Sequence, residues 1–153
     1  MSSNSKLTFK LAQSSDLERL MAYMEDFHNF DHAEPFDREP AKAAMEKVVS
    51  DNNIGRVWLI EQNNSPVGYM VLTLAYRLEY RGYYGFVDEL YVQADRRGQG
   101  IGTAALLFIK QVAADLNIEK IQLEVKQNNL AASELYRKVG FRQLARDLLI
   151  RDV

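Results

Sequence analysis

A glycine-rich turn is the part of this sequence whose residue types have the clearest chemical use. It stands between an apolar run and a segment whose apolar residues recur at helical spacing. Glycines let backbone N–H groups approach an anion closely, and the N-terminus of a helix adds a partial positive charge. The turn therefore predicts a site for phosphate groups; the other interpretation is a tight connection without a ligand. Its residues are Arg97, Gly98, Gln99, Gly100, Ile101, Gly102 and Thr103, preceded by Arg96.

Two common phosphate-binding motifs do not fit this turn. A P-loop ends in Gly-Lys followed by Ser or Thr, whereas Gly102 is followed directly by Thr103. A dinucleotide-binding turn belongs to the first strand–helix unit of its fold and has an acidic residue about 20 positions later, at the end of the next strand. Here the turn follows three or more expected strands. We therefore exclude both motifs.

A pair of adjacent acids, Asp88 and Glu89, interrupts the apolar run just before the turn. Successive side chains of a strand point to opposite faces, so only one of the two can point directly into a site on one face. Burying an unpaired carboxylate is costly. The pair therefore indicates a functional role for at least one of these residues.

An acidic run lies in the first third of the chain, between Glu25 and Glu39, with Arg38 as the only Lys or Arg in it. Such a run is either a solvated surface or an acidic rim that attracts a cationic substrate. Within it, His28, Asp31, His32 and Glu34 make a poor set of metal ligands, so no metal is expected. The same side chains are candidates to line a substrate pocket.

Four tyrosines gather between residues 76 and 84. They indicate either packing at a strand edge or an exposed aromatic surface, which would serve as a wall around an amine or as a homodimer interface. Tyr84 is the candidate for substrate contact. The others are Tyr76, Tyr80 and Tyr83.

The composition bounds the class of protein. Of 153 residues, 47% are apolar and 26% charged, and the net charge is -2, as in one globular domain over residues 1–153. No basic stripe marks a nucleic-acid partner. The lack of cysteine excludes disulfides, thiolate metal ligands and a cysteine nucleophile. No run approaches the roughly 20 apolar residues of a membrane span, so we expect a cytoplasmic protein with no membrane partner.

Hydrophobic periodicity and turn residues predict the elements that position these groups. We expect a capping box at Ser15 and Glu18 to open the first helix, and Gly140 to end the last one. Strands alternating with helices, with antiparallel hairpins at both ends, describe an α/β (α+β) fold. The expected strands are 7–11, 57–60, 67–74, 86–92, 121–125 and one or two within 141–150; the expected helices are 16–27, 41–48, 101–116 and 132–139, with a loop over 29–40.

Three motifs in register resemble the GNAT superfamily of N-acetyltransferases. They cover about the last 70 residues and are Leu90-Tyr91-Val92, Arg97-x-x-Gly100-x-Gly102 and Asn129-x-x-Ala132-x-x-Leu135-Tyr136-x-x-x-Gly140-Phe141. The resemblance implies a mixed, mainly antiparallel sheet of six to seven strands flanked by about four helices. It also implies that strands 86–92 and 121–125 splay apart around acetyl-coenzyme A.

The resemblance assigns candidate roles to the residues of these motifs. The backbone of Leu90, Tyr91 and Val92 would pair with the pantetheine arm, and the amides of 97–103 would hold the pyrophosphate. Asn129, Ala132 and Tyr136 would approach the cofactor from the other side. In this family the tyrosine at the position of Tyr136 often protonates the departing sulfur, and its alternative role is packing.

The residue that acts as the general base could lie on either of two strands. Some members of the family place a base, often acting through water, on the strand of Asp88 and Glu89, and others carry a glutamate at the position of Glu124. The alternative for Glu124 is an ordinary polar residue on the wet face of a strand. The expected acceptor is an amine of a small, cationic molecule or of a peptide. The alternatives are a protein N-terminal or lysine acetyltransferase, and a non-catalytic acyl-coenzyme A-binding regulatory module.

Overall fold

A computed structural model describes residues 5–153. These residues contain five strands, four helices and three short 3₁₀ turns. The strands are β1 (Leu7–Leu11), β2 (Gly55–Gln62), β3 (Ser65–Arg77), β4 (Gly82–Val92) and β5 (Ile121–Leu123). The helices are α1 (Leu17–Asp31), α2 (Arg38–Ser50), α3 (Ile101–Asp115) and α4 (Leu130–Lys138), and the turns are η1 (Ser14–Asp16), η2 (Leu78–Tyr80) and η3 (Ala94–Arg96).

The five strands form one sheet in chain order, β1-β2-β3-β4-β5. Strands β1 to β4 pair antiparallel with one another, and β5 pairs parallel with β4. The expected hairpin of β2 and β3 is present, and Asn63 and Asn64 turn it with positive φ angles of 52° and 66°. This is the backbone that a two-residue hairpin turn requires. The α/β class with a mixed, mainly antiparallel sheet is thus confirmed.

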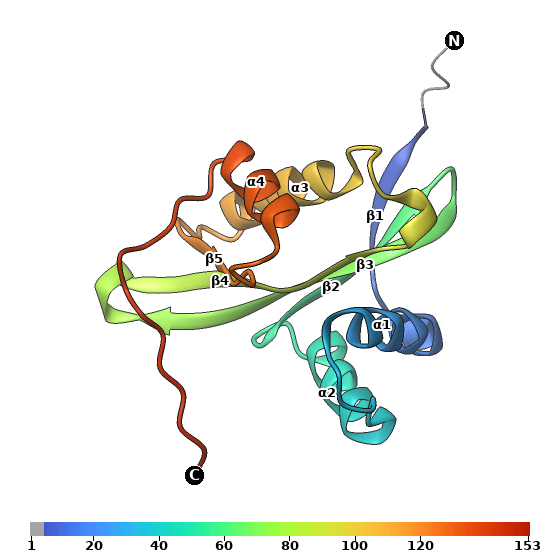
Figure 1. Cartoon of the computed structure of the whole chain (residues 1–153), viewed down its shortest axis with the longest axis horizontal. Coiled ribbons are helices and arrows are strands. Elements are labelled where there is room, and N and C mark those ends of the chain that lie inside the picture. The colour runs from blue at the N-terminus through green and yellow to red at the C-terminus, as the bar shows by residue number, and fades with distance from the viewer. Residues whose placement is uncertain (1–4) are drawn as a thin grey trace.

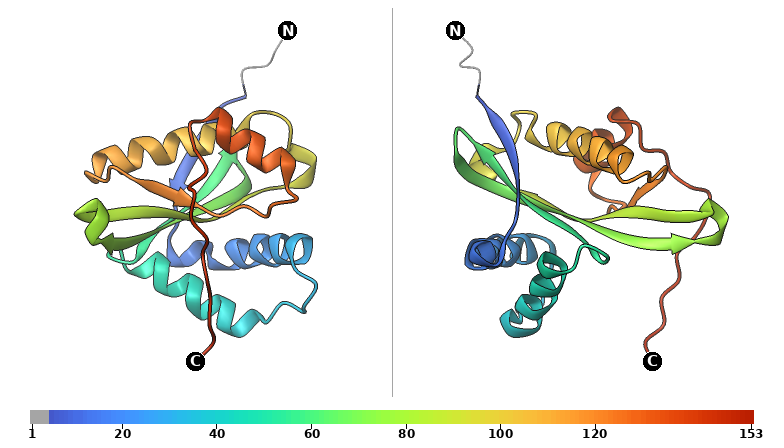
Figure 2. Two further views of the ribbon diagram at one scale, coloured as in Figure 1. Left: turned by 60° about the vertical axis from the view of Figure 1, so that its left-hand side comes forward. Right: turned by 180° about the vertical axis from the view of Figure 1, so that it is seen from behind.

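A pair of helices covers each face of the sheet (Figures 1 and 2). Alternate residues of β2 point to opposite sides, so Val57 and Leu59 pack beneath α1 and α2, whereas Trp58 and Ile60 pack beneath α3. All four side chains are buried. The apolar run of β2 therefore contributes to two cores, which fixes both helix pairs to one sheet.

The first two helices are longer than the sequence predicted. α1 continues to Asp31 and α2 already begins at Arg38, so only residues 32–37 remain of the loop expected over 29–40. The expected capping box is wrong, because Asp16 Oδ2 accepts the N–H of Gln13 at 2.9 Å in its place. Glu18 pairs instead with Arg38, at 2.6 Å across the two helices. Glu18 thus takes part in an ion pair between two helices instead of a cap at the start of α1.

The strands expected within 141–150 are absent. α4 ends as predicted, with Gly140 at φ 105°, but residues 142–153 lie in no strand and every one of them is exposed. The sheet therefore has five strands instead of six to seven. The segment that was expected to form these strands pairs with no strand among residues 5–153.

Candidate functional site

The glycine-rich turn leads from η3 into α3 with its backbone donors free. Gly98 and Gly100 have φ angles of 75° and 81°, a left-handed conformation that is strained for other residues. A Cβ atom at either position would meet nothing within 4 Å. Among residues 5–153, no acceptor takes the N–H groups of residues 98–103. The turn thus presents a run of unpaired donors at the N-terminus of a helix, which suits a pyrophosphate.

Side chains around the turn hold its shape. Arg97 donates from Nε to the carbonyl of Val92 at 2.8 Å, and its guanidinium lies over the rings of Phe30 and Tyr91. Gln62, which is buried, donates to Gln99 at 3.0 Å and accepts from Arg96 at 3.1 Å. Arg96 and Arg97 are therefore both bonded to protein groups beside the glycine-rich turn.

A β-bulge changes the expected orientation of the two acids. Val71 pairs with Glu89 and Leu72 pairs with Val87, so Asp88 is an extra residue in β4. Without a bulge, positions 87 and 89 would share a face. Instead, Val87 packs in the core beneath α3, whereas Glu89 points to the side of α1 and α2. The sequence predicted simple alternation, and the bulge overturns it.

Glu89 is held by a buried tyrosine. The hydroxyl of Tyr69, a residue with no exposed surface, donates to Glu89 Oε2 at 2.5 Å. Burial raises the pKa of the Glu89 carboxyl, the hydrogen bond from Tyr69 lowers it, and the charge of Asp88 raises it. Asp88 itself is exposed, and the protein atoms on one side of it raise the pKa of its carboxyl by displacing water. Glu89 is the acid whose position the fold fixes.

The two strands of the expected opening do diverge. β5 pairs with β4 only from Gly85 to Val87, so the edge of β4 from Asp88 to Val92 has no strand beside it in residues 5–153. Leu90, Tyr91 and Val92 keep their pairing with β3 on the other edge. The backbone that the motif predicted for pantetheine is therefore open on one side.

Helix α4 carries the last motif to the same side of the sheet. Asn129 caps the helix, because its side-chain oxygen accepts the N–H of Ala132 at 3.1 Å. Tyr136 is half-buried among the side chains beneath α3 and lies edge-on to Phe141. Burial raises the pKa of the Tyr136 phenol, and its hydroxyl makes no hydrogen bond within residues 5–153. The proton of Tyr136 is thus retained at neutral pH and available to a ligand.

The third candidate acid, Glu124, is exposed just beyond the end of β5. It makes no ion pair with any described residue, in contrast to Glu89 with its buried hydrogen-bond donor. The geometry accordingly fits a polar residue on the wet side of the strand.

A lysine from another segment lies beside the acidic run, which the sequence did not indicate. Lys126, from the segment after β5, lies 2.9 Å from Asp31 Oδ1 and also donates to the Asp31 carbonyl. His28 and His32 stack at 4.6 Å, and His28 Nε2 contacts the carbonyl of Glu34 at 2.7 Å. The structure therefore brings the predicted substrate residues of this run together and partly neutralises them.

Tyr84 lies apart from the two acids, near the start of β4. Its ring meets that of Tyr80 at 5.6 Å, and the rings of Tyr76 and Tyr83 meet at 5.3 Å. Tyr76 and Tyr83 thus meet across β3 and β4, and Tyr80 of η2 meets Tyr84 of β4, as in the packing interpretation of the tyrosines. Two residues that the sequence did not single out, Tyr69 and Lys126, hold predicted site residues, and only the strand register and the tertiary contacts reveal them.

Hollows and clusters elsewhere on the surface do not coincide with these residues. One hollow of about 520 Å³ lies beside Lys10, Asp16 and Arg19, and one of about 580 Å³ beside Leu17 and Glu46. Within residues 5–153 no three His, Asp or Glu side chains gather as metal ligands would, and no helix is long and apolar enough to cross a membrane.

Comparison with known proteins assigns the family. The sequence profile of the Acetyltransferase (GNAT) family matches residues 18–141. Thialysine N-epsilon-acetyltransferase of Bos taurus is 31% identical over 83 residues, which make up 54% of this chain and 48% of that protein. The chain thus spans about half the length of the curated relatives it matches.

Solved structures share the whole fold. An integron cassette protein from the mobile metagenome of Cole Harbour Salt Marsh is 31% identical, with a TM-score of 0.85 over 95% of this chain and 90% of that one. A predicted acetyltransferase of Clostridium acetobutylicum, solved with acetyl-CoA, is 20% identical, with a TM-score of 0.81 over 95% and 96%. This chain belongs to the GNAT acetyltransferase family.

Proposed function

We propose that this protein is an N-acetyltransferase that moves the acetyl group of acetyl-coenzyme A to an amine. The observation that carries the proposal is the run of unpaired N–H donors over residues 98–103, at the start of the helix Ile101–Asp115. Such a run binds a pyrophosphate through backbone groups alone. Family membership and the free edge of β4 from Asp88 to Val92 support the same ligand.

The residues on the two sides of β4 fit the two proton transfers of the reaction. The amine nitrogen attacks the thioester carbonyl carbon, a C–N bond forms, and the C–S bond breaks. Glu89 takes the proton that the amine loses, and the raised pKa of its carboxyl suits it to this task near neutral pH. Tyr136 gives its proton to the departing sulfur, whose pKa as a thiol is near 8.5.

The acceptor in this proposal is a small cationic amine. The acids at the end of α1 and in the loop that follows it support this acceptor, although Lys126 offsets part of the charge of Asp31. The name of the relative thialysine N-epsilon-acetyltransferase also favours an amine side chain as acceptor. Peptides and protein N-termini are the competing acceptors.

A screen of polyamines, amino acids, aminoglycosides and peptides for thiol release from acetyl-coenzyme A tests this function. Steady release with an amine is expected. Binding of acetyl-coenzyme A without turnover on any amine would instead assign a regulatory module.

The pH dependence of Glu89→Gln then tests the base. We expect kcat/KM to fall about ten- to a hundredfold at neutral pH and to recover at high pH, where the amine is already unprotonated. Glu124→Gln is the matched control and should stay near the parent. A loss of equal size at every pH would make Glu89 a positioning residue, and a large effect of Glu124→Gln alone would move the base to the other strand.

A further inference from the structure

Lys126 carries a positive charge for which acetyl transfer by itself has no use. The residue lies shortly after β5 and reaches the end of α1, where its ammonium meets Asp31 Oδ1 at 2.9 Å and donates to the Asp31 carbonyl. An ammonium group has three N–H donors. Among residues 5–153 no other acceptor takes a proton of this one, and the side chain is 55% exposed. Lys126 can therefore donate to a ligand and keep both contacts with Asp31.

The carboxylate of Asp31 has less capacity left than its lysine partner. Its Oδ1 faces Lys126, and its Oδ2 lies 3.9 Å from Nδ1 of His32. Next to it, the guanidinium of Arg97 lies 4.9 Å from the centre of the Phe30 ring. Cations thus surround the last turn of α1. The polar group that is most open to a ligand here is a donor, the ammonium of Lys126.

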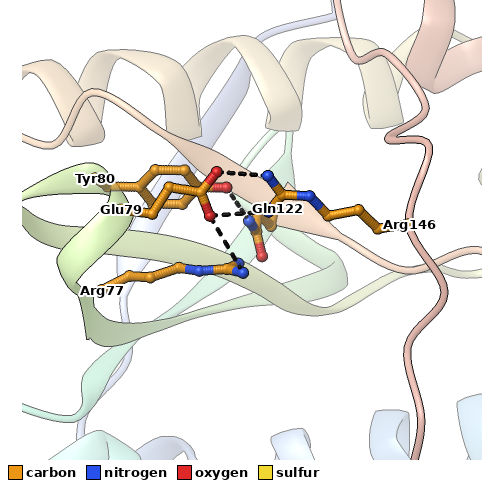
Figure 3. A network of polar contacts seen from close by, with 5 residues as sticks. All are labelled: Arg77, Glu79, Tyr80, Gln122 and Arg146. Carbon is orange, nitrogen blue, oxygen red and sulfur yellow. Dashed lines mark hydrogen bonds and ion pairs between the residues drawn. The ribbon is translucent and has the colours of Figure 1, made fainter.

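The strand before Lys126 is held firmly in place. β5 pairs with β4 along one edge. On η2, Tyr80 accepts a hydrogen bond from Gln122 of β5, beside the two-pronged ion pair of Arg146 with Glu79 (Figure 3). Because β5 is fixed in this way, the segment that follows it brings Lys126 to α1 in a defined position.

Lys126 lies on the same side of the sheet as the proposed base. Glu89 points to the side of α1 and α2, and the ammonium of Lys126 meets α1. Aromatic rings connect the two places. Tyr69, which holds Glu89, meets Tyr91 at 6.1 Å, and Tyr91 meets Phe27 of α1 at 6.1 Å. An acceptor with its amine at Glu89 therefore has its far end directed toward the end of α1, where Lys126 lies.

We propose that the acceptor carries a carboxylate at the end opposite to the reacting amine, and that Lys126 binds this carboxylate. The proposal rests on acetyl transfer to an amine as the function, and it adds the second group of the acceptor. A hydrogen bond between an ammonium and a carboxylate is roughly twice as strong as one between neutral groups. The class of acceptor is therefore an amine with an acidic end, such as an amino acid acetylated on its side chain, and not a simple diamine.

Pairs of acceptors that differ only in the carboxylate give the first test. Ornithine and putrescine form one pair, and lysine and cadaverine form the other. We expect kcat/KM for the amino acid to exceed that for its diamine about three- to tenfold in at least one pair, as for one hydrogen bond to a charged group at a half-exposed site. Equal values in both pairs, or a preference for the diamines, would overturn the proposal and leave the acetyltransferase function in place.

Lys126→Met then assigns the preference to this side chain. The KM of the amino acid should rise about three- to tenfold, and the KM of the diamine should fall, because the charge that attracts one and repels the other is removed. Lys126→Arg keeps the charge and should keep the preference. Lys120→Met, at an exposed lysine just before β5, is the matched control and should behave as the parent. A loss of equal size for both acceptors would make Lys126 a residue that only holds α1, contrary to the proposal.

Calorimetry on the complex with coenzyme A repeats the comparison without turnover. The amino acid should bind more tightly than its diamine in the parent and in Lys126→Arg, and equally or more weakly in Lys126→Met. Such a preference in a protein that releases no thiol with any amine would support the carboxylate site and refute only the acetyltransferase function. The same affinity for both compounds in the parent would refute the carboxylate site.

Discussion

The two sides of the proposed site are built from different parts of the polypeptide. On the cofactor side, the donors are backbone N–H groups of residues 98–103, shaped by Gly98 and Gly100. On the acceptor side, side chains from distant segments come together: Tyr69 holds Glu89, and Lys126 pairs with Asp31. A site made of backbone groups is determined by a few consecutive residues. A side-chain-built site depends on strand register and on contacts between elements.

The largest effect should come from Tyr136→Phe, on the cofactor side. The ring keeps its packing against Phe141, but the proton is lost. We expect kcat to fall roughly ten- to a thousandfold while the affinity for acetyl-coenzyme A stays constant. Steady-state kinetics together with calorimetry measure the two quantities. An unchanged kcat across the pH range would reduce Tyr136 to a packing residue.

Gly100→Val tests the backbone part of the cofactor side. At φ 81° a β-branched residue is strained, and relief of the strain would turn the N–H donors away. We expect the affinity for acetyl-coenzyme A to fall about ten- to a hundredfold, which corresponds to a strain of one to three kcal/mol. Gly82→Val is the control, because a Cβ there meets nothing within 4 Å and the backbone is not left-handed. Equal affinities in the two variants would remove the turn from the site.

Tyr69→Phe tests the acceptor side through the pKa of Glu89. The hydrogen bond from Tyr69 lowers that pKa, so its loss should raise the pKa further. A base works ionised, and kcat/KM should therefore begin its acidic fall at a higher pH than in the parent. We expect a loss of about two- to tenfold at neutral pH, as for one hydrogen bond.

Asp88→Asn is expected to shift the pKa of Glu89 in the opposite direction to Tyr69→Phe. It removes a charge that raises the pKa of Glu89, so the acidic fall should move to lower pH. If both substitutions left the acidic limb in place, Glu89 would not be the titrating base.

The smallest effect belongs to the acids near α1. Asp31→Asn combined with Glu34→Gln should raise KM for a diamine about two- to threefold at low salt, with kcat nearly constant, because exposed charges act weakly and are screened. Lys126→Met should lower the same KM, because it removes the lysine that pairs with Asp31. Glu18→Gln, which removes an acid already paired with Arg38, is the control. If the kinetics respond neither to salt, nor to the double substitution, nor to Lys126→Met, the acidic run is a solvated surface without a role in substrate binding.

The sequence by itself determined the α/β class, the position of the glycine-rich turn before α3 and the end of α4. Each of these follows from local rules, because glycine conformation, helix periodicity and hairpin turns are set within a few residues. The three motifs in register also led to the family, which the match over residues 18–141 confirms. The turn was identifiable because its donors are backbone groups, which every residue carries.

Only the tertiary structure decided which acid is held in place and which strand has a partner. The bulge at Asp88 arises from the register between β3 and β4, and it turns Glu89 toward Tyr69. The sequence predicted one or two strands within residues 141–150, yet residues 142–153 form none, because a strand exists only where it pairs with a neighbour and this segment pairs with no strand among residues 5–153. The composition of a segment indicates whether it can form a strand. Only the packing of the whole chain decides whether another strand pairs with it.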